Sequence, residues 1–485
     1  MMQIYKIDGI NVQVICCPPE DVNKGDYVLV EDLATAKALI IQVVNSGYAN
    51  VPGILEDILR ASSTEKVEGV DLDPLEMRSF VNIIKDAELL TCKIRGAIDK
   101  GKLSNDVNWI PSRSTSRLKK LPDEDLIKLA GIGQEEAVDI GVSKGGGKIS
   151  INISSIDGKM NIITGKKETG KSHLSKLLLL RLVSRGGVCI VFDVNGEYVN
   201  LGYTKGERKT ALHDKFIPLT PGKDFKVSLQ YAGPGVLLRI MESVLELPAT
   251  SAWEFRRIWN ELRVKGALRL EYMRSAIRAV SNNYIQDALL RRFESLISTN
   301  FFTDDVEKAT TLDKVLEKVS RGGAIIINLQ NMTSKFRQIV VEFMLSKLSQ
   351  LLEDWFLRAI FLFAEEAHLY VRETYWDDIV TRMRHLGVFT TFITNQPDSI
   401  SESVYRQADN IFLFNFTNEH DLEIVSKASR VDVETVNVIA RQLPLHHCLM
   451  LGKVLNDFPM IVRIDSLDEE TMGETRLFFA NPKQK

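Results

Sequence analysis

The first hundred residues alternate apolar and polar positions in short runs. The segments IYKI, NVQVICC, DYVLVED and KALIIQVV lie between residues 3 and 45, with the turn-forming pairs Asp8-Gly9 and Lys24-Gly25 between them. The run ELLTCKIRGAI at residues 88–98 has the same character. Because several short strands at this spacing are typical of small all-β units, the pattern predicts a small β-barrel or sandwich over residues 1–100. The mixed pattern from Pro52 to Asp86 predicts no particular element.

The pattern of apolar and polar positions changes after residue 147. Residues 101–147 hold polar and turn-forming residues, one short helical stretch and three consecutive glycines, which predicts a connector. From residue 148 to 485, strand-like runs such as MNIIT alternate with helical runs such as SHLSKLLLLRLVSR. This alternation predicts βαβ units and a parallel sheet, hence an α/β domain. Longer helical periodicity from about 234 to 299 predicts a helical insertion in that domain.

The composition mainly excludes certain classes of protein. The chain has 61 Lys and Arg against 64 Asp and Glu, so a net charge of -3 gives no overall attraction to nucleic acid or to an acidic membrane. The N-terminal residues lack the order of a signal peptide, and no uncharged apolar run reaches the roughly 18 residues of a membrane helix. We therefore expect a cytoplasmic protein with no membrane partner. The five cysteines have no metal-binding spacing, and His446, His447 and Cys448 could not easily converge on one ion from a single strand.

The strongest chemical signal is GKKETGKS at residues 165–172, which fits the pattern G-x-x-x-x-G-K-[ST]. It lies between an apolar strand and an apolar helix, where backbone N–H groups can surround phosphates at a helix N-terminus. Lys171 is expected to reach the β- and γ-phosphates of ATP, and the Ser172 hydroxyl to bind Mg²⁺. The alternative, a glycine turn with an incidental lysine, is disfavoured by the flanking strand and helix. The predicted nucleotide-binding residues are Gly165, Lys167, Glu168, Thr169, Gly170, Lys171, Ser172 and His173.

A second signal is IFLFAEEAH, in which two carboxylates follow directly after a buried strand. This is a Walker B arrangement. We predict that Glu365 holds Mg²⁺ and that Glu366 polarises the attacking water as a general base. Two acids after a strand are usually a solvated loop, but the preceding P-loop reverses that expectation.

Two further segments end at the same predicted edge of the sheet. In VFDVNGEY, Asp193 and Glu197 follow the strand after the P-loop helix, and strand tips of such sheets converge on the nucleotide. Asp193 is equally consistent with a plain turn residue. In FITNQPDS, Gln396 follows an apolar strand and could sense the γ-phosphate through its amide, although an amide at that place is also common in ordinary turns.

Taken together, these segments resemble the HerA helicase/translocase family of P-loop motors, over most of the chain. DVNGEY is similar to the family's second-strand motif, EEAH to its Walker B motif, and RHLGVFTTFITNQP and FNFTNEHDLEIV to the segments that follow. The resemblance implies a RecA-like P-loop ATPase core, an N-terminal β-barrel and an inserted helical bundle. It also implies a homo-hexameric ring around duplex DNA and, in archaea, a NurA-like nuclease partner for processing DNA ends.

The resemblance also assigns an arginine. By position, Arg384 matches the family's arginine ahead of the Gln-bearing strand, which would stabilise transition-state charge in its own or a neighbouring subunit. Arg382 and Arg406 are rivals, and each is also consistent with a surface ion pair. The chain departs from the family at the P-loop, where Lys167, Glu168 and Thr169 replace the usual residues. A carboxylate there would repel phosphate unless it pointed outward, which puts nucleotide affinity in doubt.

These observations predict an ATP-driven DNA translocase or helicase that acts with a nuclease in end resection and double-strand break repair. Two alternatives remain open: a motor of the same fold acting on protein or another nucleic acid, and a poorly hydrolysing scaffold for a nuclease. DNA-contacting residues are harder to assign. The loop YTKGERKT, with Lys205, Arg208 and Lys209, could face a pore or could be a solvated loop.

Overall fold

In the computed structural model, the described residues are 2–49, 86–104, 106–134, 136–205, 208–370, 378–428 and 431–467. The chain divides into two compact units. The first combines Met1–Ser155 with Asn410–Asp465, and the second combines Ile156–Asp409 with Ser466–Lys485. Nearly all of the segment from Pro52 to Asp86, for which the sequence predicts no element, lies outside the described residues.

The N-terminal part of the first unit is an antiparallel half-barrel. Alternate residues such as Val12 and Val14 on one strand, and Leu90 and Cys92 on its neighbour, are buried in one core. The strand order is β1-β2-β5-β4-β3-β7, with β6 paired to β5. The strands are β1 (Met2–Asp8), β2 (Asn11–Cys16), β3 (Tyr27–Asp32), β4 (Lys37–Tyr48), β5 (Glu88–Asp99), β6 (Lys102–Ser104) and β7 (Ser116–Leu121).

The rest of the first unit joins residues from both parts of the chain. Its strands follow one another in the order β16-β17-β18-β8-β9, each antiparallel to the next. Residues 101–147, predicted as a connector, thus contain β6, β7, a helix and β8, and β9 begins at the predicted boundary, residue 148. The elements are α3 (Asp123–Leu129), β8 (Ala137–Ser143), β9 (Lys148–Asn152), β16 (Asn410–Leu413), α13 (Glu419–Ala428), α14 (Val433–Ala440), β17 (His447–Gly452) and β18 (Met460–Ile464).

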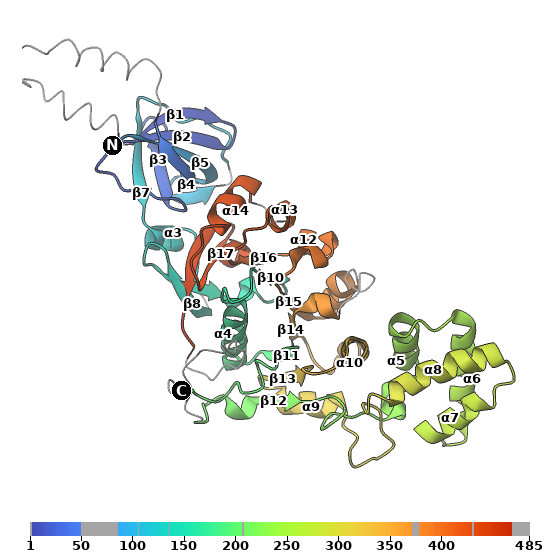
Figure 1. Ribbon diagram of the computed structural model, residues 1–485. Helices are drawn as coiled ribbons and strands as arrows, with labels where there is room; N and C mark the ends of the chain where they lie inside the picture. Colours follow the sequence, from blue (N-terminus) through green and yellow to red (C-terminus); the bar gives the residue numbers. More distant parts are fainter. Residues whose placement is uncertain are drawn as a thin grey trace, which may run out of the picture. The chain divides into compact units, whose positions relative to one another are not determined.

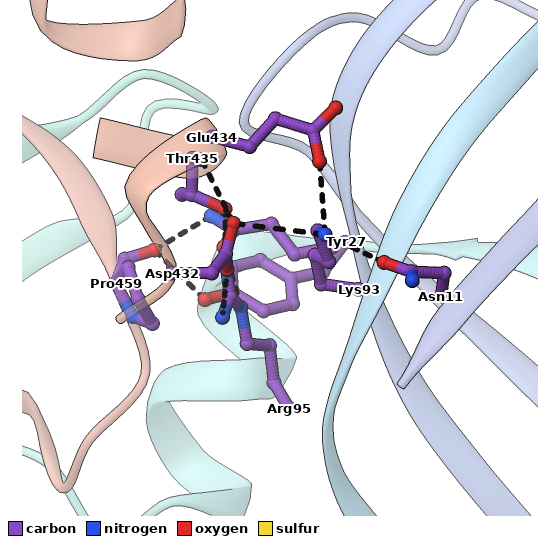
Figure 2. A network of polar contacts seen from close by, with 9 residues as sticks. Asn11, Tyr27, Lys93, Arg95, Asp432, Glu434, Thr435 and Pro459 are labelled. Carbon is purple, nitrogen blue, oxygen red and sulfur yellow. Dashed lines mark hydrogen bonds and ion pairs between the residues drawn. The ribbon is translucent and has the colours of Figure 1, made fainter. Parts of the chain in front are cut away.

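A buried polar network connects the half-barrel to the C-terminal part of the same unit (Figure 2). Arg95 of β5 pairs with Asp432, the N-cap residue of α14, at 3.1 Å, and Lys93 lies 3.8 Å from the same carboxylate. The Tyr27 hydroxyl donates to the carbonyl of Pro459 at 2.7 Å. Because an unpaired charge is costly inside a protein, these contacts fix how the two parts of the first unit pack.

The second unit is built on a parallel sheet. The order is β12-β13-β11-β14-β15-β10, and every pairing between these neighbours is parallel. The strands are almost wholly buried and rich in Val, Ile and Phe, as expected where helices cover both faces. They are β10 (Asn161–Thr164), β11 (Val188–Asp193), β12 (Phe216–Leu219), β13 (Gly323–Asn328), β14 (Ile360–Glu365) and β15 (Val388–Thr394).

Two groups of helices belong to the second unit. One group connects its strands: α4 (Lys171–Ser184), α9 (Leu312–Val319), α10 (Ser334–Glu353) and α12 (Glu402–Gln407). The other group lies together as a helical bundle in Figure 1: α5 (Leu229–Arg239), α6 (Ala249–Val264), α7 (Leu270–Arg278) and α8 (Asn283–Ile297). Helices therefore occupy the predicted insertion. None of the described helices is long and apolar enough to cross a membrane.

Candidate nucleotide-binding site

The predicted chemical residues meet at one edge of the parallel sheet. Strands β10, β11, β14 and β15 all end there, at Thr164, Asp193, Glu365 and Thr394. The register places Thr164 beside Thr394, and Glu365 beside the residue that precedes Thr394. The carboxyl ends of parallel strands are where ligands bind in open α/β sheets.

The P-loop leaves β10 and turns into α4 at this edge. Gly170 precedes the helix with a φ of 117°, in the left-handed region that glycine adopts without strain, and no side chain caps the helix there. The loop is braced by its own residues, since the Thr169 hydroxyl donates to the Lys166 carbonyl at 2.8 Å. Lys167 and Glu168 are exposed. The unusual carboxylate of this P-loop therefore lies at the surface of the loop.

Lys171 lies inside the loop, with its side chain buried. Its ammonium donates to the Lys166 carbonyl at 2.6 Å. Burial lowers the pKa of Lys171 to about 8, against the attraction of Glu366, Glu197 and Glu365, which raises it. A bound polyphosphate would stabilise the charged ammonium, so the position suits an anion.

Glu365 is buried and has a hydrogen-bond donor close to one of its two oxygens. Its Oε1 lies 3.4 Å from the Ser172 hydroxyl of the first turn of α4, while its Oε2 is buried without a hydrogen-bond partner among the described residues. Burial, followed by the charges of Glu197 and Asp193, raises the pKa of Glu365 well above its usual range. A divalent cation would satisfy the unpartnered oxygen and offset this burial. Hydroxyl and carboxylate oxygens are the protein ligands that Mg²⁺ takes beside a nucleotide.

Glu366 is set apart from Glu365 by its backbone. Its φ of 45° lies in the left-handed region and begins the short helix η4 (Ala367–Leu369). Its Oε2 is also buried and unpartnered among the described residues. Burial raises the pKa of Glu366, whereas Lys171 and the backbone amide of Asn395 lower it. A carboxylate with a raised pKa is a stronger base, which suits proton removal from water.

Asp193 organises the turn that follows β11. Its carboxylate accepts the backbone N–H groups of Gly196, Glu197 and Tyr198 at 2.8 to 2.9 Å. Burial raises the pKa of Asp193, and these three hydrogen bonds oppose the rise. The turn brings Glu197 to the ammonium of Lys176, 2.8 Å away. Asp193 thus holds the turn, and its side chain also contacts Glu365, so both predictions for Asp193 have contacts in the structure.

Gln396 lies just past the end of β15. Its backbone N–H donates to the Thr394 hydroxyl at 3.0 Å, and its side-chain oxygen accepts from Ser399 at 3.3 Å. His173 lies in the first turn of α4, partly buried. Both therefore stand at the P-loop edge of the sheet.

The three predicted arginines have carboxylate partners within the chain. Arg384 pairs with Asp409 at 2.9 Å and donates to the Gly158 carbonyl, which precedes β10 at the opposite edge of the sheet from the P-loop. Arg382 pairs with Glu353 and Arg406 with Glu402, each at 2.9 Å. Arg384 therefore lies away from the P-loop edge of the sheet in its own chain.

The predicted DNA loop belongs to the second unit, where Tyr203 and Lys209 form an isolated antiparallel bridge. Lys205, Arg208 and Lys209 are all exposed, and Thr204 donates to the Arg208 carbonyl at 2.8 Å. The two residues at the tip of the loop, 206 and 207, lie outside the described residues.

Sequence reasoning missed several polar side chains of the site. Thr164, Asn395 and Tyr370 each hold a buried oxygen with no hydrogen-bond partner among the described residues. Lys176, the partner of Glu197, and His368, which lies between Glu366 and Thr394, were also missed. His368 is part of the segment IFLFAEEAH, but its contacts with Glu366 and Thr394 can be seen only in the folded structure. Among the described residues, no three His, Cys, Asp or Glu side chains form a ready metal cluster, and the five cysteines are free thiols.

Comparison with known proteins matches this architecture. The family model for the central domain of helicase HerA matches residues 138–348. The DNA double-strand break repair helicase HerA of Saccharolobus solfataricus is 22% identical over 397 residues, which cover 75% of each chain. The protein of the same name from Sulfolobus acidocaldarius is 19% identical over 488 residues, covering 94% of this chain and 91% of its own.

Solved structures show the same fold at low identity. The plasmid coupling protein TrwB in complex with ADP and Mg²⁺ has a TM-score of 0.53 at 14% identity, covering 73% of this chain and 94% of its own. VirB4 of Thermoanaerobacter pseudethanolicus has a TM-score of 0.50 at 15% identity, covering 69% and 98%. The predicted fold class, an α/β P-loop ATPase core with an N-terminal β domain, is confirmed.

Proposed function

The chain is a distant homologue of the archaeal HerA helicases over most of its length, and from this premise we propose that it is an ATP-driven DNA translocase or helicase. The observation that carries the proposal is the convergence of Lys171, Ser172, Glu365 and Glu366 at one edge of the sheet. Each has the burial and the neighbours that nucleotide hydrolysis requires. ATP is the substrate and Mg²⁺ the expected cofactor.

The residues divide the work of hydrolysis. The P-loop amides and Lys171 hold the phosphates, and Lys171 exchanges its contact with the Lys166 carbonyl for a phosphate oxygen. Ser172 and Glu365 would hold Mg²⁺, which neutralises charge on the phosphates when bound. Glu366 orients the attacking water and takes its proton. Gln396, at the end of β15, is placed to sense the γ-phosphate.

Arg384 is proposed to act from a neighbouring subunit. It lies at the opposite edge of the sheet from its own P-loop, and the strand between them spans about 20 Å at 3.3 Å per residue. This separation supports a role at the nucleotide of a neighbouring subunit. This agrees with a homo-hexameric ring in which each site is completed by the next subunit, with Arg382 and Arg406 as rivals for the same role.

Partners follow from the homology alone. We propose duplex DNA as the track, with the exposed loop of Lys205, Arg208 and Lys209 as a candidate contact, and a NurA-like nuclease as the partner in end resection and double-strand break repair. Exposed guanidinium and ammonium groups on a loop suit phosphate contacts. The alternative of a non-hydrolysing scaffold rests on Glu168, and the exposure of this side chain is compatible with a carboxylate that points away from the phosphates.

The test is ATP turnover of the full chain with and without linear duplex DNA, with Lys171→Ala as the inactive control. We expect turnover that rises with duplex DNA and is absent in the variant. Turnover that DNA does not change would favour a motor acting on protein. Nucleotide binding without turnover under every condition would favour the scaffold.

A further inference from the structure

His368 stands between the proposed base and the strand end that carries Gln396. It lies in η4, directly after the two glutamates, and its side chain is only 9% exposed. Its Nδ1 is 3.2 Å from the Thr394 hydroxyl and 3.5 Å from Oε2 of Glu366. One ring nitrogen therefore faces two different parts of the site.

The hydrogen-bond pattern around Thr394 indicates which nitrogen carries the proton. The Thr394 hydroxyl accepts the Gln396 backbone N–H at 3.0 Å and lies 3.2 Å from the Gln396 carbonyl, to which it can only donate. A hydroxyl has one proton, so its contact with His368 is satisfied when Nδ1–H of the ring is the donor. Burial lowers the pKa of His368, which favours the neutral ring with a single N–H.

The second acceptor within reach is incomplete. Oε2 of Glu366 is buried and has no hydrogen-bond partner among the described residues. At 3.5 Å it lies just beyond a good hydrogen bond to the same Nδ1–H. Because an unsatisfied buried carboxylate oxygen costs free energy, a shift of about half an ångström would transfer the donor to it favourably.

We propose that His368 is a positioning residue whose single Nδ1–H alternates between the Thr394 hydroxyl and the Glu366 carboxylate. When it turns to Glu366, it holds Oε2 and leaves the other oxygen directed at water. When it returns to Thr394, the base is released and the turn of Gln396 is held. The inference rests on the proposed ATP hydrolysis, because it assigns the base an orienting partner.

The segment that follows β15 has a second interaction with Glu366. The backbone amide of Asn395, which lies between Thr394 and Gln396, is one of the groups that lower the pKa of Glu366. The base thus has two neighbours linked to the end of β15: the amide of Asn395, which belongs to that segment, and the imidazole of His368, which contacts the Thr394 hydroxyl. A movement of Gln396 would therefore alter the orientation of the base.

Three substitutions separate positioning from simple packing. In His368→Asn, the side-chain amide can place a donor near the position of Nδ1, whereas in His368→Gln the donor lies near Nε2. His368→Leu fills the volume with no donor. We expect kcat for ATP to fall about 10- to 100-fold in the Leu and Gln variants, with ATP binding changed by less than about threefold, and to recover largely in the Asn variant. Equal loss in all three variants would overturn the proposal.

A background variant links the effect to the base. If His368 acts through Glu366, adding His368→Leu to Glu366→Gln should lower the residual turnover no further. An independent further loss would show that His368 acts elsewhere.

A second measurement does not depend on turnover. The chain has seven histidines, and in protein labelled with ¹⁵N-histidine the ring signal that is lost in His368→Asn belongs to His368. We expect the Nδ1–H tautomer, and a shift of that signal in Thr394→Val. The Nε2–H tautomer would overturn the inference even in a protein that hydrolyses ATP normally, whereas failure of the proposed function would appear as lost turnover of the unmodified chain.

Discussion

The ammonium of Lys176 lies 2.8 Å from the carboxylate of Glu197, and their side chains are only 4% and 14% exposed. The ammonium also lies 5.4 Å from the centre of the Tyr198 ring. Lys176 belongs to the P-loop helix and Glu197 to the turn that Asp193 organises, so this pair joins two elements of the nucleotide site.

We expect Lys176→Met to destabilise the protein by about 3 to 5 kcal/mol, because it leaves a buried carboxylate without its cation. Glu197→Gln should restore part of the loss when the two changes are combined. Urea unfolding of the two single variants and the double variant measures this coupling. The matched control is Lys265→Met, whose ion pair with Glu261 at 2.7 Å is largely exposed and should matter little. Equal destabilisation by the two lysine changes would contradict the prediction.

Lys171→Ala is expected to abolish ATP hydrolysis and to weaken nucleotide binding, since the phosphates lose the ammonium that the loop holds in place. Steady-state turnover and binding of a fluorescent ATP analogue measure both effects. Lys265→Ala is a suitable control, because Lys265 is an exposed lysine at the end of α6, outside the P-loop. Near-normal turnover in Lys171→Ala would remove the P-loop assignment.

Substitution of the two glutamates is expected to impair ATP hydrolysis in two different ways. Glu366→Gln should bind ATP and Mg²⁺ but lose all except a small residual turnover, because the amide keeps the shape of the side chain and loses its basicity. Glu365→Gln should instead raise the Mg²⁺ concentration needed for half-maximal turnover. A Mg²⁺ titration of both variants distinguishes the roles. If Glu365→Gln gives the trapped state and Glu366→Gln the weakened metal dependence, the two assignments are reversed.

Arg384→Ala is expected to bind ATP normally and to hydrolyse it about a thousandfold more slowly if it completes a neighbouring site. Rings mixed from Arg384→Ala and Lys171→Ala subunits should then regain part of the activity, because some interfaces pair an intact P-loop with an intact arginine. Native mass measurement confirms the mixing. No recovery in confirmed mixed rings would shift the role to Arg382 or Arg406.

The partner of Arg384 supplies the control for this prediction. Asp409→Asn removes the carboxylate that pairs with Arg384 while keeping the guanidinium. A loss of turnover as large as in Arg384→Ala would show that the ion pair itself, and the local fold that it holds, is what hydrolysis needs.

The network of Asp432 predicts an acid-sensitive contribution to stability. Burial raises the pKa of Asp432, but the Thr435 amide and Arg95 outweigh it, and the net pKa is lowered. A lowered folded-state pKa stabilises the protein above the unfolded value near 3.8 and loses this effect as the pH falls through the folded value. Asp432→Asn should therefore cost about 3 kcal/mol at pH 7, and the difference from the unmodified chain should shrink below about pH 4.

Thermal unfolding of the two proteins from pH 7 to pH 3 measures that difference. Amide exchange by mass spectrometry should show faster exchange in α14 and β5 of the variant, with the P-loop helix unchanged. Asp8→Asn, at an ion pair that is 75% exposed on the aspartate side, is the control. A constant difference at all pH values would mean that Asp432 contributes through shape and not through charge.

The parts of the fold that depend on local pattern are predictable from the sequence. The P-loop, the paired glutamates and Asp193 are each fixed by a strand and by the residues that follow it, and the structure places all of them at one edge. The strands CLMLG and MIVRID are also visible as apolar runs. The strand that pairs with MIVRID is not visible from the local pattern. The strand formed by MIVRID, β18, pairs with β8, some 320 residues earlier in the chain, within the stretch predicted as a connector.

The same reason explains what was missed in the site. Lys176 and His368 have no distinctive local pattern, and their importance lies in what faces them after folding. The position of Arg384 relative to the P-loop also depends on the direction of β15 in the sheet. Resemblance to a family placed that arginine in a motif, but it could not show that the side chain pairs with Asp409.

The first unit is formed by two segments of the chain, residues 1–155 and 410–465, which flank the segment 156–409 of the second unit in the sequence. During synthesis on the ribosome, the half-barrel emerges early, with Lys93 and Arg95 already in its strands, but Asp432 arrives only after the whole ATPase segment has been translated. For that interval the two cations lack the carboxylate that neutralises them. We therefore expect nascent chains that end before residue 410 to remain sensitive to proteases in β5, and release of the C-terminal segment to be the step that completes the N-terminal unit.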